Sequence, residues 1–387
     1  MLDSSSQSHS MRVAESSVGR IPALDGIRGL AISLVLWWHF AISPLRGNLQ
    51  NLQDHPYLWR IAEFGRFTWS GVDLFFVLSG FLIGGILLDA SRSPSFFSTF
   101  YIRRAYRIIP LYAVIILLTL VLIPLYGRMG WQRYATELLY YLFFLQNLRM
   151  AVTKSFGPLG LGMTWSLAVE EQFYLTLPLA VRHVKGKMLW RLLLGAVVAA
   201  TLLRILAVEF LKMNWIGPYV ITPCRADALC LGVLIAMAIR SPSVWKKIVA
   251  RRRYLYAALV FASAVGLWLV LGPFQPFTME LLGLEYSLFA LIYSLLLVST
   301  LVSPQLSSLF SFAPLRFLGI IAYGLYLFQS LVSFVLDRVL LHFGRAGGIV
   351  VTFQMSVLAV AASVGLAATS WKYFEKPLVG RGHRYQY

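Results

Sequence analysis

Charge, acidic residues and cysteine are all scarce in this sequence. Only 13% of its 387 residues are Asp, Glu, Lys or Arg, against about 25% in soluble globular proteins. That scarcity excludes an ordinary soluble domain, and the chain is instead apolar: 58% of the residues are hydrophobic and the mean hydropathy is +0.71. The composition predicts an all-α polytopic membrane protein that forms a single helical domain.

Acidic residues are few, with 16 Asp and Glu against 34 Lys and Arg, and the net charge is +18. Such a balance often indicates nucleic-acid binding, but here the basic residues lie in loops between apolar segments. We interpret them as the cytoplasmic face of a membrane protein, in contact with membrane lipids, and expect no nucleic acid as a partner. The same face would attract anionic donors such as nucleotides.

Several signatures of soluble chemistry are missing as well. The two cysteines, Cys224 and Cys230, lie in an apolar stretch at a spacing that fits neither a redox motif nor a zinc site, so we interpret them as packing residues. The six histidines show no metal-ligand spacing, and the sequence has no glycine-rich nucleotide loop and no nucleophile elbow. We therefore predict no metal and no permanently bound cofactor.

Ten apolar segments have the roughly 17–25 residues that a bilayer-spanning helix needs. They lie near residues 24–43, 68–88, 108–126, 164–181, 189–210, 224–240, 254–272, 282–302, 315–337 and 349–371. With the N-terminus inside, Lys and Arg in the inner loops outnumber those in the outer loops by about two to one. About ten transmembrane helices are thus predicted, with both termini cytoplasmic, in a bacterial-type cytoplasmic (inner) membrane.

Three further segments complete the predicted organisation. Residues 1–20 are rich in Ser and are expected to form a disordered cytoplasmic tail, residues 21–376 to form the transmembrane domain, and residues 377–387 to form a second cytoplasmic tail. Residues 136–150 are apolar but short, and if they crossed the membrane the basic 240–253 loop would face outward. We predict a re-entrant or interfacial helix there, on the outer side.

The first apolar segment, 24–43, contains three residues that do not belong in lipid: Asp25, Arg28 and His39. Arg28 and His39 are eleven residues apart, almost three whole helical turns, so both project from one face about 16 Å apart along the axis. A charge that faces lipid costs at least about 2.5 kcal/mol, so this face should look into protein or a wet cavity. The alternative is an interfacial anchor pair, with His39 as a hydrogen-bonded packing residue.

Two further groups of polar residues lie near the first loop. Asp73 is the one charge in the 68–88 segment, near its outer end, and Ser79 precedes glycines that let a helix or a ligand approach closely. Arg104 and Arg107 lie one turn apart before the third segment, where two guanidiniums make a fork for phosphate oxygens. An ordinary positive flank of a membrane helix explains the two arginines equally well.

The fourth segment carries Glu170 and Glu171, with Ser166 one turn before Glu170. Carboxylates at this depth are costly, so a functional role is the first interpretation. Glu170 is a candidate partner for Arg28 or His39 or a group that orients an acceptor hydroxyl. The alternative is a structural salt bridge to an arginine of the fifth or sixth segment, Arg204 or Arg225.

Polar residues also mark the sixth and ninth segments. Arg225 and Asp227 lie at the start of 224–240, where they pair with other segments or line an acceptor cleft. Tyr323 and Tyr326 lie three residues apart on one face of 315–337. Core packing with satisfied hydroxyls is the alternative interpretation for both tyrosines.

Successive motifs of the chain resemble the membrane acyltransferase family 3, whose members O-acylate sugars and similar acceptors. The motifs are LDGIRGLAI with the following His39, GVDLFFVLSGFLI, RRAYRIIPLY, TWSLAVEEQFYL, CRADALCLG, LGIIAYGLYLFQ and FEKPL, in the order of the family. The resemblance implies an acyl-coenzyme A donor, usually acetyl-coenzyme A as co-substrate, an essential His39, and donor contacts from Arg104 and Arg107. The chain departs from the family at Gln329, where a histidine is usual, and at Ala322, where serine is common.

These observations combine into a hypothesis of direct acyl transfer. Arg104 and Arg107 hold the phosphates of acyl-coenzyme A and Arg28 neutralises charge near them. His39 acts as general base on the acceptor hydroxyl. Asp25 is expected to fix Arg28, because it lies too far along the helix to reach His39.

The remaining roles in this hypothesis fall to other segments. A group from another helix must orient His39, with Glu170 and Asp73 as candidates. Tyr323 or Tyr326 would donate a hydrogen bond to the oxyanion. An acyl-imidazole on His39 stays open, as do two acceptor classes, a saccharide or glycolipid and a small metabolite such as a macrolide. A proton-coupled transporter is the rival class, since buried ionisable residues also mark ion paths.

Overall fold

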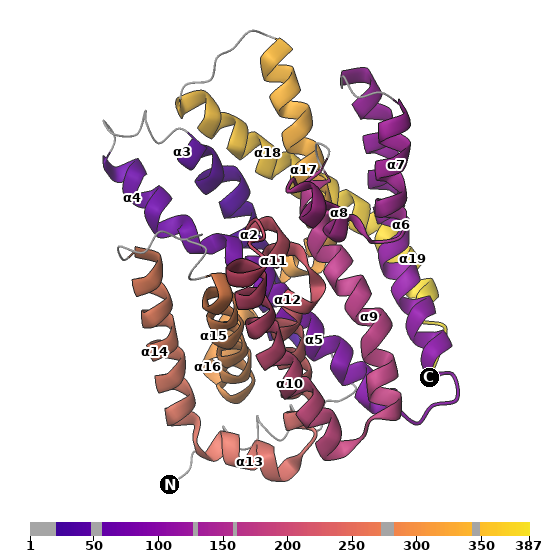
Figure 1. Ribbon diagram of the computed structural model, residues 1–387, viewed down its shortest axis with the longest axis vertical. Helices are drawn as coiled ribbons and strands as arrows, with labels where there is room; N and C mark the ends of the chain where they lie inside the picture. The colour runs from indigo at the N-terminus through magenta and orange to yellow at the C-terminus, as the bar shows by residue number, and fades with distance from the viewer. Residues whose placement is uncertain (1–20, 48–55, 127–130, 158–160, 272–281, 343–348) are drawn as a thin grey trace.

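The computed structural model describes residues 21–47, 56–126, 131–157, 161–271, 282–342 and 349–387, and within these ranges the chain is helical and contains no strand. The expected all-α fold is confirmed. The predicted disorder of residues 1–20 lies outside the described residues. Each helix below is labelled as in Figure 1.

The helices follow one another as α2 (Pro22–Trp37), η1 (Trp38–Ile42, π-helical), α3 (Ser43–Gly47), α4 (Pro56–Phe64), η3 (Gly65–Ser70, 3-10), α5 (Gly71–Ala90), α6 (Phe96–Tyr126), α7 (Trp131–Leu142), α8 (Gln146–Thr153), η4 (Gly162–Thr164, 3-10), α9 (Trp165–His183), α10 (Gly186–Ile205), η5 (Leu206–Phe210, π-helical), α11 (Ile216–Val220), α12 (Thr222–Ile239), α13 (Pro242–Ala250), α14 (Arg252–Leu271), α15 (Leu282–Val302), α16 (Pro304–Phe310), α17 (Ala313–His342), α18 (Ile349–Ser370), η6 (Trp371–Glu375, π-helical) and α19 (Lys376–Gly382).

Within the part of the chain that the structure describes, seven helical segments are long and apolar enough to cross a membrane, judged by length and composition. They coincide with seven of the ten predicted spans. The other three predicted spans, at 108–126, 164–181 and 254–272, are helical as α6, α9 and α14 but are not among the seven. In α9 the reason is visible in the sequence, because its two glutamates and a C-terminal arginine lower its hydropathy.

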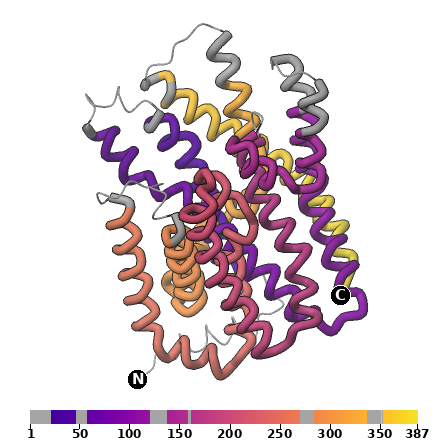
Figure 2. The backbone as a smooth tube through the Cα atoms, viewed as in Figure 1, coloured from indigo at the N-terminus to yellow at the C-terminus, as the bar shows by residue number. Residues whose placement is uncertain are grey.

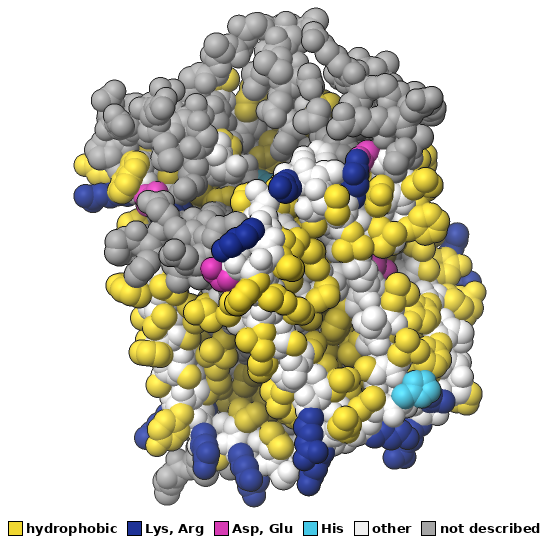
Figure 3. Space-filling model, in the orientation of Figure 1, with side chains coloured by type: hydrophobic (Ala, Val, Ile, Leu, Met, Phe, Trp, Pro, Cys, Tyr) yellow, Lys and Arg dark blue, Asp and Glu magenta, His cyan; other side chains and the backbone are white. Residues whose placement is uncertain are grey.

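The bundle has a basic end and an apolar middle (Figure 3). Helix α13 runs across the lower end of the view, and the 240–253 segment that contains it carries six Lys and Arg. Figure 3 shows Lys and Arg side chains along this lower rim and hydrophobic side chains over the middle of the face. We call this the basic end. The end of α9 also lies there, since Arg182 donates a hydrogen bond to the Ser91 carbonyl in the α5–α6 loop.

Helix α2 packs closely against α17 at the centre of the bundle, because glycines face the neighbouring backbone. A Cβ atom added to Gly319 of α17 would lie 1.7 Å from the Asp25 carbonyl oxygen, and one added to Gly29 would lie 1.9 Å from that of Leu315. Helices α5 and α12 meet in the same way, with Gly80 against the Leu229 backbone. The glycines after Ser79 therefore serve close helix packing, as the first interpretation of that motif proposed.

Residues 136–150 form parts of two short helices rather than one. Helices α7 and α8 have 12 and 8 residues, too few to cross a bilayer core of about 30 Å at about 1.5 Å per residue. Between them Phe144 has a φ of 53°, which breaks the helix. Helix α8 is anchored by buried amides: Gln146 donates to the Thr164 carbonyl at 3.0 Å and Asn147 to the Val220 carbonyl at 3.2 Å.

The segment after α18 turns back along α6 instead of leaving the bundle. The predicted domain boundary at 376/377 falls at the start of α19, and α19 lies beside the first half of α6 at the edge of the molecule (Figure 1). Figure 2 shows the same adjacency in the backbone trace. Cys224 and Cys230 are buried and unbridged, in keeping with packing roles.

Candidate active site

His39 lies in the π-helical turn η1, directly after the regular helix α2. Its Nδ1 atom lies 2.8 Å from the Val35 carbonyl oxygen, four residues earlier. A carbonyl oxygen only accepts, so Nδ1 carries the proton and Nε2 holds the lone pair of the neutral ring. The expectation that Glu170 or Asp73 orients His39 is therefore wrong, because the backbone of its own helix does so.

His39 lines a cavity of about 460 Å³, which we call the histidine cavity. Half of its described lining residues are aromatic, and among them His39 is the one titratable imidazole while none is a carboxylate, a lysine or an arginine. The aromatic residues are Trp38, Trp69, Phe156, Trp165, Trp215, Tyr219 and Tyr326. Several hold each other by ring contacts, for example Trp165 and Tyr219 with centroids 4.5 Å apart. The wall is thus apolar, aromatic and uncharged.

The three arginines expected to bind a donor all line a second cavity of about 350 Å³, the arginine cavity. Arg28 comes from α2, and Arg104 and Arg107 from the start of α6. Among the described residues of its wall, Glu170 is the one carboxylate, so the cavity carries net positive charge. Such a site attracts anionic groups, and guanidiniums suit phosphate oxygens in particular.

Glu170 belongs to the arginine cavity and not to the histidine cavity. Its carboxylate lies close to Ser79 and within electrostatic reach of Arg28, Arg104 and Arg107. Ser79 also shares a 2.5 Å hydrogen bond with Tyr174, and the Arg104 guanidinium lies 5.8 Å from the centre of the Tyr174 ring. Glu170 thus lies on the same cavity wall as the arginines, and a partnership with Arg28 stays a prediction.

The two cavities share part of one wall. Val72 of α5 and Tyr326 of α17 line both of them. The Tyr326 hydroxyl donates to the Met163 carbonyl at 2.5 Å and shares a 2.6 Å hydrogen bond with Ser166. The Tyr323 hydroxyl donates to the Ile108 carbonyl at 2.7 Å. Because both phenolic protons are held by backbone carbonyls, neither tyrosine is placed as the oxyanion donor that the sequence suggested.

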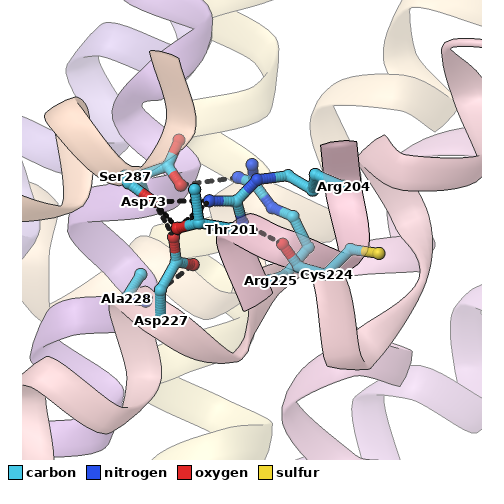
Figure 4. Close-up of polar contacts among 8 residues, drawn as sticks. All are labelled: Asp73, Thr201, Arg204, Cys224, Arg225, Asp227, Ala228 and Ser287. Atoms are coloured by element: carbon cyan, nitrogen blue, oxygen red, sulfur yellow. Dashed lines mark hydrogen bonds and ion pairs between the residues drawn. The ribbon is translucent and has the colours of Figure 1, made fainter. Parts of the chain in front are cut away.

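Asp73, Arg225 and Asp227 lie in a buried ionic network outside both sets of lining residues (Figure 4). Asp73 and Arg225 form an ion pair of 2.6 Å, and each side chain is 1% exposed. The expected catalytic role of Asp73 through His39 has no support in this arrangement. The pair instead joins α5 to α12.

The second pair of this network joins α10 to α12. Arg204 lies 2.8 Å from Asp227, which also accepts a hydrogen bond of 2.8 Å from Ser287. Arg204 donates to the Cys224 carbonyl as well. The alternative in which Glu170 forms a salt bridge with Arg204 or Arg225 is therefore wrong, since each arginine is paired with an aspartate.

Asp25 and Gln329 are the last two residues that the sequence analysis singled out. Asp25 forms the expected ion pair with Arg28, at 2.9 Å. Gln329 is 1% exposed and its amide nitrogen lies 3.6 Å from the Met163 sulfur. Ala322, the second departure from the family pattern, lines the arginine cavity. Gln329 therefore supports Met163, which forms part of the histidine cavity wall.

Sequence reasoning missed two features of these cavities. The tryptophans of the histidine cavity come from four separate segments. Trp165 is the one that stands in a quoted motif, and the sequence predicted no role for it. His383 lines the arginine cavity but lies in the segment predicted to be a tail. In the described ranges no three His, Cys, Asp or Glu side chains come together in a way that could hold a metal ion.

Comparison with known proteins agrees with this architecture. The profile of a family described as an acyltransferase domain matches residues 21–368, and the chain belongs to this family. It is 29% identical over 391 residues to the peptidoglycan O-acetyltransferase OatA of Listeria monocytogenes, covering 94% of this chain and 56% of the relative. It is 28% identical over 386 residues to a putative peptidoglycan O-acetyltransferase, YrhL, of Bacillus subtilis, with the same coverage of each chain.

A third relative, the O-acetyltransferase OatA of Staphylococcus aureus, is 25% identical over 386 residues, covering 94% of this chain and 58% of the relative. The chain thus spans little more than half the length of these relatives. No solved structure matches it. Together with its apolar helices, these relationships identify it as a multi-pass membrane protein of the acyltransferase family.

Proposed function

We propose that this protein is an O-acyltransferase that moves an acetyl group from acetyl-coenzyme A to a hydroxyl of a saccharide, with peptidoglycan or a related glycan as the acceptor. One observation carries the proposal: an arginine-lined cavity and a histidine-lined cavity share a wall at Tyr326. A phosphate-bearing donor and a neutral acceptor thus each have a matching site. The names of the relatives support acetyl as the group and peptidoglycan as the acceptor.

The donor half rests on charge and length. Arg28, Arg104 and Arg107 bind the phosphates of the donor, and the long pantetheine arm extends along α2 toward His39, about 16 Å further by helical rise. The 240–253 segment makes one end of the bundle strongly basic, and basic loops favour the cytoplasmic side of an inner membrane. We therefore assign this cavity and both termini to the cytoplasmic side. Acyl-coenzyme A is a cytoplasmic metabolite, so the two assignments agree.

The acceptor half rests on the aromatic wall. The flat C–H face of a pyranose packs against Trp and Tyr rings, and its hydroxyls remain free to reach polar groups. A wall without carboxylates or guanidiniums suits a neutral sugar better than a charged ligand. The size of about 460 Å³ falls within the range of about 300–1,000 Å³ that is usual for ligand sites.

In the proposed step the Nε2 atom of His39 takes the proton of the acceptor hydroxyl. The oxygen attacks the thioester carbonyl, the C–S bond breaks, and the imidazolium returns the proton to the leaving thiolate. The hydrogen bond to Val35 fixes the tautomer that this step needs. A positioned base of this kind contributes about 10²–10⁴-fold.

The test is acceptor-dependent release of free coenzyme A. The full chain in nanodiscs receives acetyl-coenzyme A and a panel of peptidoglycan fragments, and thiol release is compared with that of His39→Gln, which keeps a polar side chain. We expect release that requires an acceptor and falls at least about 100-fold in the variant. Unchanged release in a folded His39→Gln protein would move the base elsewhere. If the protein neither releases nor binds coenzyme A, the acyltransferase proposal would fail and a transporter would be the favoured class.

A further inference from the structure

The last described residues of the chain are tied to α6 by side chains of that helix. We call residues 376–387, which comprise α19 and the five residues after it, the docking segment. Arg103 donates to the Tyr385 carbonyl at 2.8 Å. The Gln386 carbonyl accepts from Thr99 at 2.9 Å and from Ser95 at 3.1 Å. These three contacts hold consecutive peptide units of the segment against α6 and the residue that precedes it.

Ring contacts fix the docking segment further. Tyr385 stacks on Tyr106 with ring centroids 6.3 Å apart, and the Arg103 guanidinium lies 4.9 Å from the centre of the Tyr387 ring. Gly382 is buried, and a Cβ atom there would lie 3.0 Å from the Tyr106 Cβ. The segment therefore has a defined place on α6, where Figure 1 shows the two running side by side.

Helix α6 presents different residues to its two neighbours. Thr99, Arg103 and Tyr106 contact the docking segment, and their spacing of four and three places them on one face. Arg104 and Arg107 lie on the adjacent face and line the arginine cavity. His383, which follows Gly382 in the docking segment, lines the same cavity.

We propose that His383 is a donor-binding residue of the arginine cavity, held there by the docking segment. Its imidazole N–H donates a hydrogen bond to a phosphate oxygen of the ligand that Arg28, Arg104 and Arg107 attract. The assignment of that ligand as acyl-coenzyme A rests on the proposed function. The position of His383 among these arginines is independent of that assignment.

The charges around His383 predict a pH dependence. Arg103, Arg104 and Arg107 face it from α6 and Arg28 lines the same cavity from α2, while Arg381 and Arg384 flank it in its own segment. Partial burial, and then the positive charges of Arg103, Arg107 and Arg104, lower the pKa of His383 below the usual value of about 6.5. The ring is thus neutral at pH 7.

Bound phosphates offset the surrounding positive charge and raise the pKa of His383 in the complex. Since the bound form then holds the proton more tightly than the free form, binding takes up a proton. The affinity for the donor therefore increases as pH falls from 7.5 toward 6. The phosphates titrate in this range too, but they do so equally in any variant.

The experiment measures binding of coenzyme A to the full chain in nanodiscs, without acceptor, by calorimetry at several pH values. His383→Gln should weaken binding roughly 3- to 10-fold, as expected for one partly exposed hydrogen bond to a charged group, and should flatten the pH dependence. The matched control is His183→Gln, which changes another exposed histidine, at the end of α9, that is not among the residues lining the cavity. This control should bind as the unmodified protein does.

A second variant tests the role of the docking segment without changing charge. Thr99→Val removes the hydrogen bond to the Gln386 carbonyl, and should weaken binding in the same direction as His383→Gln. The double variant should lose less affinity for coenzyme A than the product of the two separate fold-changes, because both substitutions act through the His383 side chain. Equal affinity and equal pH dependence in His383→Gln would overturn the inference and leave the proposed function standing. No coenzyme A binding by the unmodified protein would overturn both.

Discussion

Ser166 of α9 and Tyr326 of α17 share a hydrogen bond of 2.6 Å beside the wall that the two cavities have in common. The bond links the helix of Glu170 to the helix that closes the histidine cavity. It also holds Tyr326 where it lines both the arginine cavity and the histidine cavity. The first prediction concerns the ring of Tyr326.

Replacing Tyr326 by Ala should raise release of coenzyme A in the absence of acceptor. In the proposed reaction the donor arm passes Tyr326 on its way toward His39. Without the ring, more water from the histidine cavity reaches the thioester, and shielding from water is what suppresses such side reactions. The measurement is free thiol over time with acetyl-coenzyme A alone, where we expect a several-fold rise. Tyr326→Phe is the control: it keeps the ring and loses about 0.5–1.5 kcal/mol of stability with the hydrogen bond to the Met163 carbonyl, which still accepts from the Trp165 N–H. A similar rise in both variants would argue against the ring as the barrier.

Arg104→Gln and Arg107→Gln should each raise the KM for acetyl-coenzyme A roughly tenfold or more with little change in kcat, because each removes a charge-assisted hydrogen bond to a phosphate. The effect should shrink at high salt, where the cavity field is screened. Initial rates over a range of donor concentrations measure it. Arg251→Gln, an exposed arginine of the same basic end outside the cavity wall, should leave both constants unchanged. A fall in kcat at constant KM would instead place the arginines in the chemical step.

Asp73→Asn should destabilise the protein by about 3–5 kcal/mol, because it leaves Arg225 as a buried charge without its counter-ion. The thermal unfolding midpoint in detergent measures the loss. Replacing both residues, Asp73→Leu with Arg225→Met, should recover most of it, since an apolar pair needs no charge compensation.

The control for this loss is Asp89→Asn, which breaks the Asp89–Arg240 pair of 2.5 Å at the surface. The side chains of that pair are 45% and 30% exposed, so the cost should stay below about 1 kcal/mol. If the two single substitutions cost the same, burial would not be what makes the Asp73 pair matter.

Gly319→Ala should separate α17 from α2. Its new Cβ would lie 1.7 Å from the Asp25 carbonyl oxygen, and overpacking of this kind costs about 1–3 kcal/mol or more. Because Asp25 also holds Arg28, donor binding should weaken together with stability. Gly195→Ala in α10 has nothing within 4 Å of the new atom and should stabilise the helix by up to about 1 kcal/mol. Unfolding midpoints of the two variants give the comparison.

Much of the fold follows from local sequence, because the membrane imposes it. Length and hydropathy are enough to find the helices, and a charge in lipid is expensive enough to mark α2 as facing the interior. The Asp25–Arg28 pair was predictable too, since it depends on two residues three positions apart in one helix. The arginines of α6 gather with Arg28 only through tertiary packing, yet their chemistry pointed to the same ligand.

The partners of the other charges could not be read from the chain. Asp73 and Arg225 are 152 residues apart, and several carboxylates and guanidiniums of similar depth were available to each. Hydropathy indicates how deep a residue lies in the membrane, but not toward which neighbouring helix its side chain points. That direction decides which charged side chains meet. The orientation of His39 was missed for another reason: a π-helical turn brings its ring to a backbone carbonyl, and backbone groups carry no signature in the sequence.

The shared wall at Val72 and Tyr326 has an electrical consequence. In an energised membrane each elementary charge that crosses gains or loses about 2.3 kcal/mol per 100 mV, and a continuous water-filled path would let protons dissipate that store. In the proposed topology the arginine cavity opens to the cytoplasm and the histidine cavity to the other side, so only the side chains between the two cavities would separate the two aqueous phases. In that topology Tyr326, whose hydroxyl donates its proton to the Met163 carbonyl, would offer no proton relay across this layer and would thereby help to preserve the membrane potential.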